Sequence, residues 1–207
     1  MTSGLIRMTK KDKIAEAKDL FQKGVDYWQE DRIDEAIECL EKAVELDPEY
    51  LDAWYNLGNA YYSGKGDFDS AYKYWQKALE LDPDEVDVLY NLGNAYRERE
   101  EFDKAIECYK KVVAKNPKDH EGWNNMANAY YGKGEIKSAI ECWQKALEIK
   151  PDKVETWYNL GVIYLELEEF EKSIECTQKA LEFYPESDRL HSLLNAAKRG
   201  KEAQEQK

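Results

Sequence analysis

The stretch WYNLGNAYY, residues Trp54 to Tyr62, decides the fold of this chain because it returns at a nearly constant spacing. Recognisable copies are LYNLGNAY, WNNMANAYY and WYNLGVIY at residues 89–96, 123–131 and 157–164, and a diverged copy covers residues 20–28. The copies start at residues 20, 54, 89, 123 and 157, so the period is 34 residues with one step of 35. A period of this length predicts an array of stacked supersecondary units.

The composition of the 207 residues restricts the class of protein. With 43% hydrophobic and 35% charged residues, the chain has enough apolar material for a continuous core. The net charge of −13 disfavours nucleic acid as a partner, because phosphate backbones would be repelled on average. No apolar run reaches the roughly 18 residues of a membrane span, and the N-terminus lacks the apolar stretch of a signal peptide. We therefore expect a soluble, cytoplasmic protein.

The cysteines Cys39, Cys108, Cys142 and Cys176 follow the repeat, the last three being 34 residues apart. Packed helices lie about 8–10 Å apart, whereas a disulfide requires Cα atoms within about 4.4–6.8 Å. No CxxC motif or histidine cluster accompanies the cysteines. We expect reduced thiols at a small, half-buried helix position, and neither a metal nor a cofactor.

Each repeat is predicted to be a pair of helices. In the second repeat, Trp54, Leu57, Gly58 and Tyr61 occupy one face of a helix over residues 51–62. The small Gly58 allows a second helix over residues 69–81, which carries Trp75, to approach closely. The turn over 63–67 carries one extra residue, and we expect N-caps at Asp34, Asp69 and Asp103. A proline follows every second helix and ends it, at Pro48, Pro83, Pro117, Pro151 and Pro185.

The predicted organisation is a single continuous array over residues 9–199. The repeats cover about 17–50, 51–85, 86–119, 120–153 and 154–187, and an apolar stripe predicts a capping helix over 188–199. Residues 1–8 are expected to be disordered and residues 200–207 to form a frayed tail.

The pattern W-x2-LG-x2-Y, followed at fixed offsets by Ala, an aromatic residue, Ala and Pro, resembles the tetratricopeptide repeat (TPR) family over residues 17–187. The resemblance implies an all-α, right-handed TPR superhelix, an α-solenoid of antiparallel helix pairs. It also implies a non-catalytic module for protein–protein interaction, with the first helices lining a concave groove. The residues agree, since neither His120 nor His191 accompanies a nucleophile and no phosphate-binding or dinucleotide motif is present.

Asparagine recurs on the first helices although it is a mediocre helix former. Carboxamides can donate to and accept from the main chain of an extended peptide, and tyrosine adds flat contact area. Common residue usage within the TPR family is the alternative explanation. The predicted peptide-binding residues are Tyr55, Asn56, Asn59, Tyr62, Tyr90, Asn91, Asn94, Arg97, Asn124, Asn125, Asn128, Tyr131, Tyr158 and Asn159.

One acidic residue per repeat is expected at the edge of the groove: Asp52, Asp87, Glu121 and Glu155. A row of one sign favours a neutral or basic peptide segment, and Arg97 is the one cation placed on the groove. The cations of the dicarboxylate clamp of chaperone-binding TPR proteins are missing, which disfavours an acidic chaperone tail. A structural scaffold that self-assembles through its ends or convex face is the alternative function.

Overall fold

The computed structural model describes residues 8–206, which contain eleven α-helices, one π-helix and no strand. The elements are α1 (Lys10–Gln29), α2 (Ile33–Leu46), α3 (Leu51–Asn59), η1 (Ala60–Gly64), α4 (Phe68–Leu81), α5 (Val86–Glu98), α6 (Phe102–Lys115), α7 (His120–Lys133), α8 (Ile136–Ile149), α9 (Val154–Glu166), α10 (Phe170–Phe183) and α11 (Asp188–Glu205). The prediction of an all-α fold built from helix pairs is confirmed.

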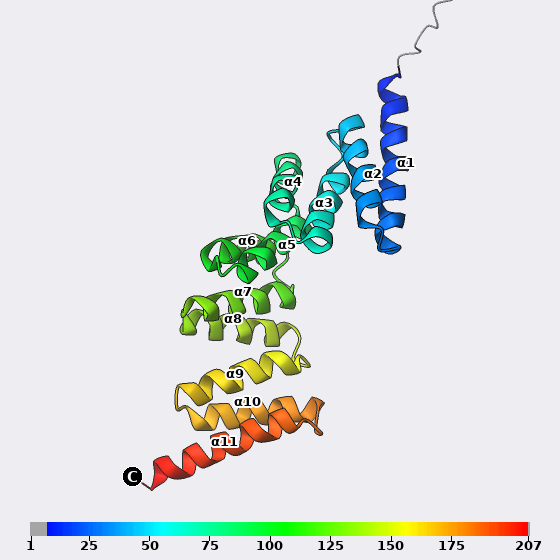
Figure 1. Cartoon of the computed structure of the whole chain (residues 1–207). Coiled ribbons are helices and arrows are strands. Elements are labelled where there is room, and N and C mark those ends of the chain that lie inside the picture. The colour runs from blue at the N-terminus through cyan, green and yellow to red at the C-terminus, as the bar shows by residue number, and fades with distance from the viewer. Residues whose placement is uncertain (1–7, 207) are drawn as a thin grey trace, which may run out of the picture. The chain divides into compact units, whose positions relative to one another are not determined.

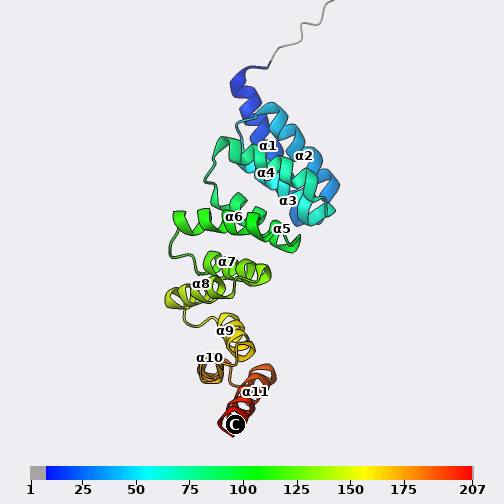
Figure 2. The same cartoon turned by 90° about the vertical axis from the view of Figure 1, so that its left-hand side faces the viewer.

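The helices form two compact units, residues 1–92 and 93–207, and the division falls within α5. The sequence predicts a single array over 9–199. In the first unit, α1 packs against α2 and α3 against α4. In the second unit, α7 pairs with α8 and α9 with α10, and α11 packs on α10 (Figures 1 and 2).

In repeats two and three, the two helices meet where a glycine faces an aromatic ring. A Cβ atom on Gly58 would collide with the indole of Trp75, and one on Gly93 would lie 2.8 Å from Tyr109 Cε1. Both aromatic side chains are fully buried. Burial of a large apolar side chain contributes about 1.5–3 kcal/mol, so the missing side chain on the first helix permits the main packing contact of the pair.

The extra residue of the second repeat lies inside the first helix. The predicted position in the turn over 63–67 is wrong, because α3 continues as the π-helix η1. A π-turn, with its i→i+5 hydrogen bonds, accommodates one inserted residue without breaking the helix. After it, Gly64 packs on Ile33 as Gly132 packs on Phe102, so the turn keeps the contacts of the other repeats.

The predicted N-caps are also displaced. Asp34, Asp69 and Asp103 lie within the first turns of α2, α4 and α6, which begin one residue earlier. Asp67 caps α4 instead, accepting from Ser70 N at 3.1 Å. A carboxylate in the first turn still stabilises a helix through the positive end of its dipole.

The C-terminal helix α11 is longer than predicted. It continues from the expected capping segment 188–199 through Glu205, so residues 200–205 of the predicted frayed tail are helical. Lys201 Nζ lies 3.1 Å from Glu171 Oε1, and Gly200 packs on Phe170. These contacts with α10 explain the extension. Of the predicted disordered segment 1–8, residues 1–7 lie outside the described residues.

A recurring hydrogen bond holds the start of three first helices, α3, α7 and α9, to the preceding proline. The Nε1 atoms of Trp54, Trp123 and Trp157 donate to the carbonyl oxygens of Pro48, Pro117 and Pro151 at 2.8–3.0 Å. In α11, His191 takes the same register position, with Nε2 2.8 Å from Pro185 O. The helix α11 therefore lies in the register of a further first helix.

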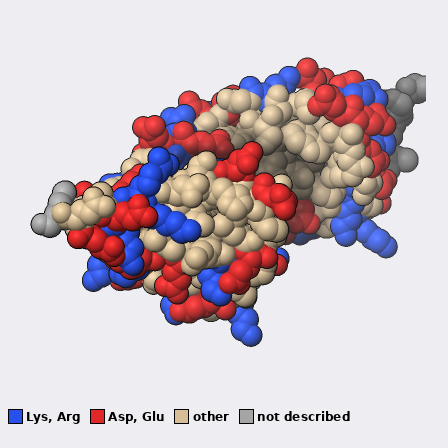
Figure 3. All heavy atoms as spheres, turned by 90° about the horizontal axis from the view of Figure 1, so that it is seen from below, with Lys and Arg blue, Asp and Glu red and all other residues tan. Residues whose placement is uncertain are grey.

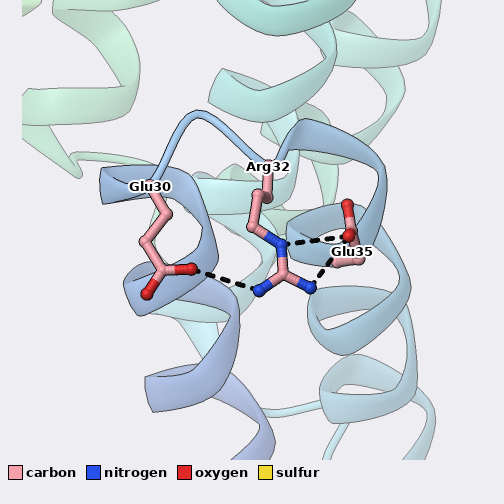
Figure 4. Close-up of polar contacts among 3 residues, drawn as sticks. All are labelled: Glu30, Arg32 and Glu35. Atoms are coloured by element: carbon pink, nitrogen blue, oxygen red, sulfur yellow. Dashed lines mark hydrogen bonds and ion pairs between the residues drawn. The ribbon is translucent and has the colours of Figure 1, made fainter.

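Charged side chains hold the turn between α1 and α2. The guanidinium of Arg32 donates to Glu35 at 2.9 Å and to Glu30 at 3.2 Å (Figure 4). These hydrogen bonds raise the pKa of Arg32, and the bond to Glu35 has the larger effect. The equivalent turn between α5 and α6 has the opposite charges, since the carboxylate of Glu101 accepts from its two neighbours, Arg99 at 2.9 Å and Lys104 at 2.6 Å.

Every first helix of a repeat is followed, within two residues of its end, by a residue with a positive φ. This residue is glycine in two repeats, Gly66 and Gly134, but Asp31, Glu100 and Glu168 have φ angles of 58–60°. A left-handed conformation costs an L-residue about 1–2 kcal/mol, and glycine avoids that cost.

We predict that Glu100→Gly and Glu168→Gly each raise the free energy of unfolding by about 0.5–1 kcal/mol. The relief of left-handed strain exceeds the extra chain entropy that glycine must lose on folding. Urea unfolding followed by circular dichroism measures the change. The matched control Gly134→Ala should lower stability by about 1 kcal/mol, and a lower midpoint for Glu168→Gly would contradict the strain argument.

Candidate functional site

A pocket lies on the first-helix face of the N-terminal unit. We call it the Trp28 pocket; its volume is about 190 Å³. It receives side chains from α1, α3, η1 and α5, the first helices of three successive repeats, together with one residue of α2. Its lining residues are Gly24, Val25, Trp28, Leu40, Asn56, Asn59, Ser63 and Asn91.

A second pocket lies on the first-helix face of the C-terminal unit. This Arg97 pocket has a volume of about 250 Å³ and receives side chains from α5, α7 and α9, together with one residue of α8. Its lining residues are Arg97, Asn128, Tyr131, Trp143, Tyr158, Asn159, Val162 and Ile163. The two pockets share a register, because Trp28, Asn59 and Asn91 are equivalent to Arg97, Asn128 and Asn159.

The last asparagine of the first helix in each of repeats two to four has a structural hydrogen bond. Trp75 Nε1 donates to Asn59 Oδ1 at 3.1 Å, and Trp143 Nε1 donates to Asn128 Oδ1 at 3.1 Å. The hydroxyl of Tyr109 donates to Asn94 Oδ1 at 2.7 Å. These asparagines therefore satisfy the buried donors of the second helices.

The sequence contained a signal for this structural role. Asparagine occurs at this position only where the facing residue of the second helix carries a donor. In the first repeat the pair is Val25 and Leu40, and in the fifth it is Val162 and Thr177. The hydroxyl of Thr177 instead donates to Ser173 O at 2.7 Å, which leaves no donor for an asparagine.

A side-chain network joins two repeats in the N-terminal unit. Asn91 Nδ2 donates to Asn59 Oδ1 at 2.9 Å and to the hydroxyl of Tyr55 at 3.1 Å. Together with the bond from Trp75, the carboxamide oxygen of Asn59 accepts two hydrogen bonds. The network fixes the side chains that form one wall of the Trp28 pocket.

Other predicted residues also have contacts within the protein. Asn56 Nδ2 donates to Asp52 O at 2.8 Å, and the hydroxyl of Thr156 donates to Asn124 Oδ1 at 3.0 Å. The ring of Tyr62 packs 5.4 Å from that of Trp75. The predicted residues that line neither pocket are Tyr55, Tyr62, Tyr90, Asn94, Asn124 and Asn125.

The Arg97 pocket retains hydrogen-bonding groups without partners. Arg97 Nε is buried and has no hydrogen-bond partner among residues 8–206. No side-chain hydrogen bond is recorded within the described chain for Asn159, which is half-buried. Tyr131 is 42% exposed, and its ring packs 5.9 Å from that of Trp143. The pocket therefore combines free polar groups with an accessible aromatic ring.

The acidic row predicted at the edge is partly neutralised. Glu155 lies 3.4 Å from Arg189 Nη1, and Glu121 lies 3.7 Å from Lys153 Nζ. The guanidinium of Arg189 lies 3.5 Å above the ring of Tyr158. The expectation that Arg97 is the one cation on this face is therefore wrong. Arg189 follows Glu155 by one period of 34 residues, so the register contained this signal.

Charges of both signs are also mixed at the surface. Basic and acidic side chains are interspersed on the face visible in Figure 3, and the acidic ones are more frequent. Asp52 and Asp87, the remaining predicted edge acids, are exposed. In the part of the chain that the structure describes, no helix is both long enough and apolar enough to cross a membrane.

The thiols of the cysteine column are free. Cys108, Cys142 and Cys176 are buried, and burial raises the pKa of their thiols to about 11, 11 and 12. Thiolates are the reactive form, so these cysteines are poorly suited to nucleophilic chemistry near neutral pH.

The helix pairs, their period and the pockets on the first helices define an α-solenoid repeat protein. The chain belongs to the tetratricopeptide repeat family. The family profile described as TPR repeat matches residues 24–64, 65–98, 93–134 and 127–168, and the profile described as Tetratricopeptide repeat matches residues 154–187. Proteins of this family are protein-interaction modules.

One relative is the Tetratricopeptide repeat domain-containing protein PYG7, chloroplastic, from Arabidopsis thaliana, with 50% identity over 42 residues. The match spans 20% of this chain and 14% of that protein. Among solved structures, MamA (41-end) from Desulfovibrio magneticus RS-1 has a TM-score of 0.76 and 22% identity, covering 84% of this chain and 97% of its own. YrrB, described as a TPR protein with an unusual peptide-binding site, has a TM-score of 0.73 and 25% identity, covering 93% and 98%.

We predict energetic coupling between Asn94 and Tyr109. Tyr109→Phe and Asn94→Val should each lower the free energy of unfolding by about 1–2 kcal/mol, because each leaves a partner unsatisfied. The double variant should lose about 1 kcal/mol less than the sum. Urea unfolding of the four proteins measures this coupling. As the control, Val162→Asn in repeat five should give no gain, and additive losses would contradict the structural role of the asparagine.

The same tyrosine should contribute to unfolding in alkali. Burial raises the pKa of Tyr109 to about 12, with the nearby Arg97 opposing the rise. The pKa of tyrosine in the unfolded chain is about 10. The folded protein therefore holds the proton more tightly, and this contribution to stability is complete below pH 10 and lost as the pH rises to about 12. Tyr109→Phe should reduce the pH dependence of the unfolding midpoint in that range.

Proposed function

We propose that this protein is a non-catalytic interaction module that binds an extended peptide segment of a partner protein on its first-helix faces. The observation that carries the proposal is the pair of pockets in one register, each lined by the first helices of three successive repeats. The peptide-binding site described for YrrB supports the same type of ligand.

The free groups of the Arg97 pocket suit the main chain of an extended peptide. An extended strand presents a carbonyl oxygen or an N–H group along each edge at short intervals. The guanidinium of Arg97 lines the pocket, and the half-buried Asn159 carboxamide can both donate and accept. The exposed rings of Trp28 and Tyr131 offer apolar contact for side chains of the peptide.

The charge around the pockets favours a neutral segment in the C-terminal unit. Lys153 and Arg189 offset Glu121 and Glu155 there, so a basic side chain would gain little. In the N-terminal unit, the exposed Asp52 favours a neutral or basic residue. An acidic chaperone tail is disfavoured, because the register positions of the clamp cations carry other residues.

We predict that Asn159→Ala weakens peptide binding about fivefold or more, because it removes a hydrogen bond worth about 1 kcal/mol. Peptides selected from a displayed random library on the full chain supply the ligands, and calorimetry measures their affinity. The control Asn195→Ala changes an exposed asparagine of α11 and should leave the affinity unchanged. A selection without enriched peptides, or equal affinity for both variants, would reject binding in the Arg97 pocket.

The π-helix provides a second test, in the N-terminal unit. Deleting Ser63 should convert η1 into a regular helical turn, as in the other repeats, and remove a polar lining residue of the Trp28 pocket. We predict that the deletion variant folds. Its affinity should fall about fivefold or more for peptides that bind at the Trp28 pocket, identified because they shield Trp28 from a fluorescence quencher. Ser63→Ala, which retains the π-turn, separates the shape of the helix from the hydroxyl. Unchanged affinity in the deletion variant would exclude this pocket.

Self-assembly is the second candidate, and exposed aromatic residues favour it. Phe183 and Tyr184 at the end of α10 are 47% and 60% exposed, and such patches occur at protein interfaces. Concentration-dependent sedimentation that is abolished by Phe183→Ser with Tyr184→Ser would support a self-assembling scaffold. A monomer at all concentrations would eliminate it.

A further inference from the structure

A larger pocket opens on the other side of the C-terminal unit, among α8, α9 and α10. We call it the Cys176 pocket; its volume is about 550 Å³, within the range of about 300–1,000 Å³ that is usual for ligand sites. Its lining residues are Gln144, Leu147, Glu148, Trp157, Leu160, Tyr164, Lys172, Glu175 and Cys176. None of these residues lines the Arg97 pocket.

The walls of the Cys176 pocket are aromatic and held in place. Leu160 and Cys176 form a buried apolar floor. The indole of Trp157 is fixed by its hydrogen bond to Pro151 O, and the hydroxyl of Tyr164 accepts from Gln144 Nε2 at 3.3 Å. Two aromatic side chains beside an apolar floor suit an aromatic guest, and Glu148, Lys172 and Glu175 add charged groups to the lining.

The N-terminal unit carries the same constellation with a side chain in the space. Three repeats earlier in the register, Cys176 corresponds to Tyr74, Trp157 to Trp54, and Tyr164 to Tyr61. The ring of Tyr74 stacks on Trp54 at 6.0 Å with an interplanar angle of 21°. It lies 5.2 Å from the ring of Tyr61. Repeat two therefore shows that a tyrosine ring fits between these two aromatic side chains.

The polar end of the site also has an equivalent. The hydroxyl of Tyr61 donates to Glu41 at 3.0 Å and also interacts with the hydroxyl of Tyr74. Gln144 takes the register position of Glu41 in the Cys176 pocket and already contacts Tyr164. A phenol ring in the pocket would thus bring its hydroxyl to the Tyr164 hydroxyl, whereas a plain hydrocarbon would add no hydrogen bond to the existing contact between Gln144 and Tyr164.

We propose that the Cys176 pocket binds a tyrosine side chain of a partner protein, in the position that Tyr74 occupies in repeat two. The exchange of tyrosine for cysteine at one register position removes an aromatic ring and retains its binding walls. The site is separate from the first-helix faces, so a partner could contact both sides of the C-terminal unit. The proposal does not depend on peptide binding in the Arg97 pocket.

The test uses the full chain and the probe N-acetyl-tyrosine amide. Saturable chemical-shift changes are expected at the indole N–H of Trp157 in NMR titration, and N-acetyl-leucine amide should produce none. Cys176→Tyr should fill the pocket and abolish the changes, while Cys142→Ala, at the equivalent position of repeat four, should preserve them. Circular dichroism confirms that each variant is folded.

A reciprocal variant keeps the test decisive if Cys176→Tyr does not fold. Tyr74→Cys should open an equivalent site in the N-terminal unit, with new shifts at the indole N–H of Trp54. Absence of saturable binding, or binding that Cys176→Tyr leaves intact, would overturn the proposal. If p-cresol binds and N-acetyl-tyrosine amide does not, the pocket would be assigned to a small free phenol instead. A dimer that dissociates on Tyr184→Ser would assign it to a second copy of the chain.

Discussion

The contact between a glycine of the first helix and an aromatic side chain of the second is the constraint on which repeats two and three depend. Gly58 and Gly93 let Trp75 and Tyr109 lie directly on the helix backbone and become fully buried. A larger residue would separate the helices and expose the rings. Each ring also carries a polar hydrogen that needs an acceptor, so this packing requires a carboxamide on the first helix as well.

That requirement divides the asparagines into two functional groups. Asn59, Asn94 and Asn128 support the packing of their own repeats, and Asn91 extends one of these bonds to the neighbouring repeat. Asn159 faces a pocket without such a bond. The asparagines of the first helices look uniform in sequence, but few of them have carboxamide groups free to bind a ligand. The surfaces available for recognition therefore differ from one repeat to the next.

The sequence was sufficient for the helix pairs, because their spacing and the glycine–aromatic pattern depend on local periodicity. It did not determine where the inserted residue of repeat two lies, since a π-turn and a longer loop produce the same 35-residue step. Only the packing after the insertion distinguishes the two. The position of Arg189 over Tyr158 does not follow from a capping role of α11, because it requires α11 to lie in the register of a further first helix. The Cys176 pocket was missed because an empty space depends on which side chains are absent.

The opposite charges of two equivalent turns affect how the chain can misfold. Similar repeats could mispair during folding, with the first helix of one repeat packing on the second helix of another. If α1 paired with α6, Glu30 would face Glu101, and if α5 paired with α2, Arg99 would face Arg32. Both mispaired turns would bring like charges together, and both native turns join opposite charges. These exposed clusters add little to stability once the fold has formed, but they disfavour exchange between repeats one and three.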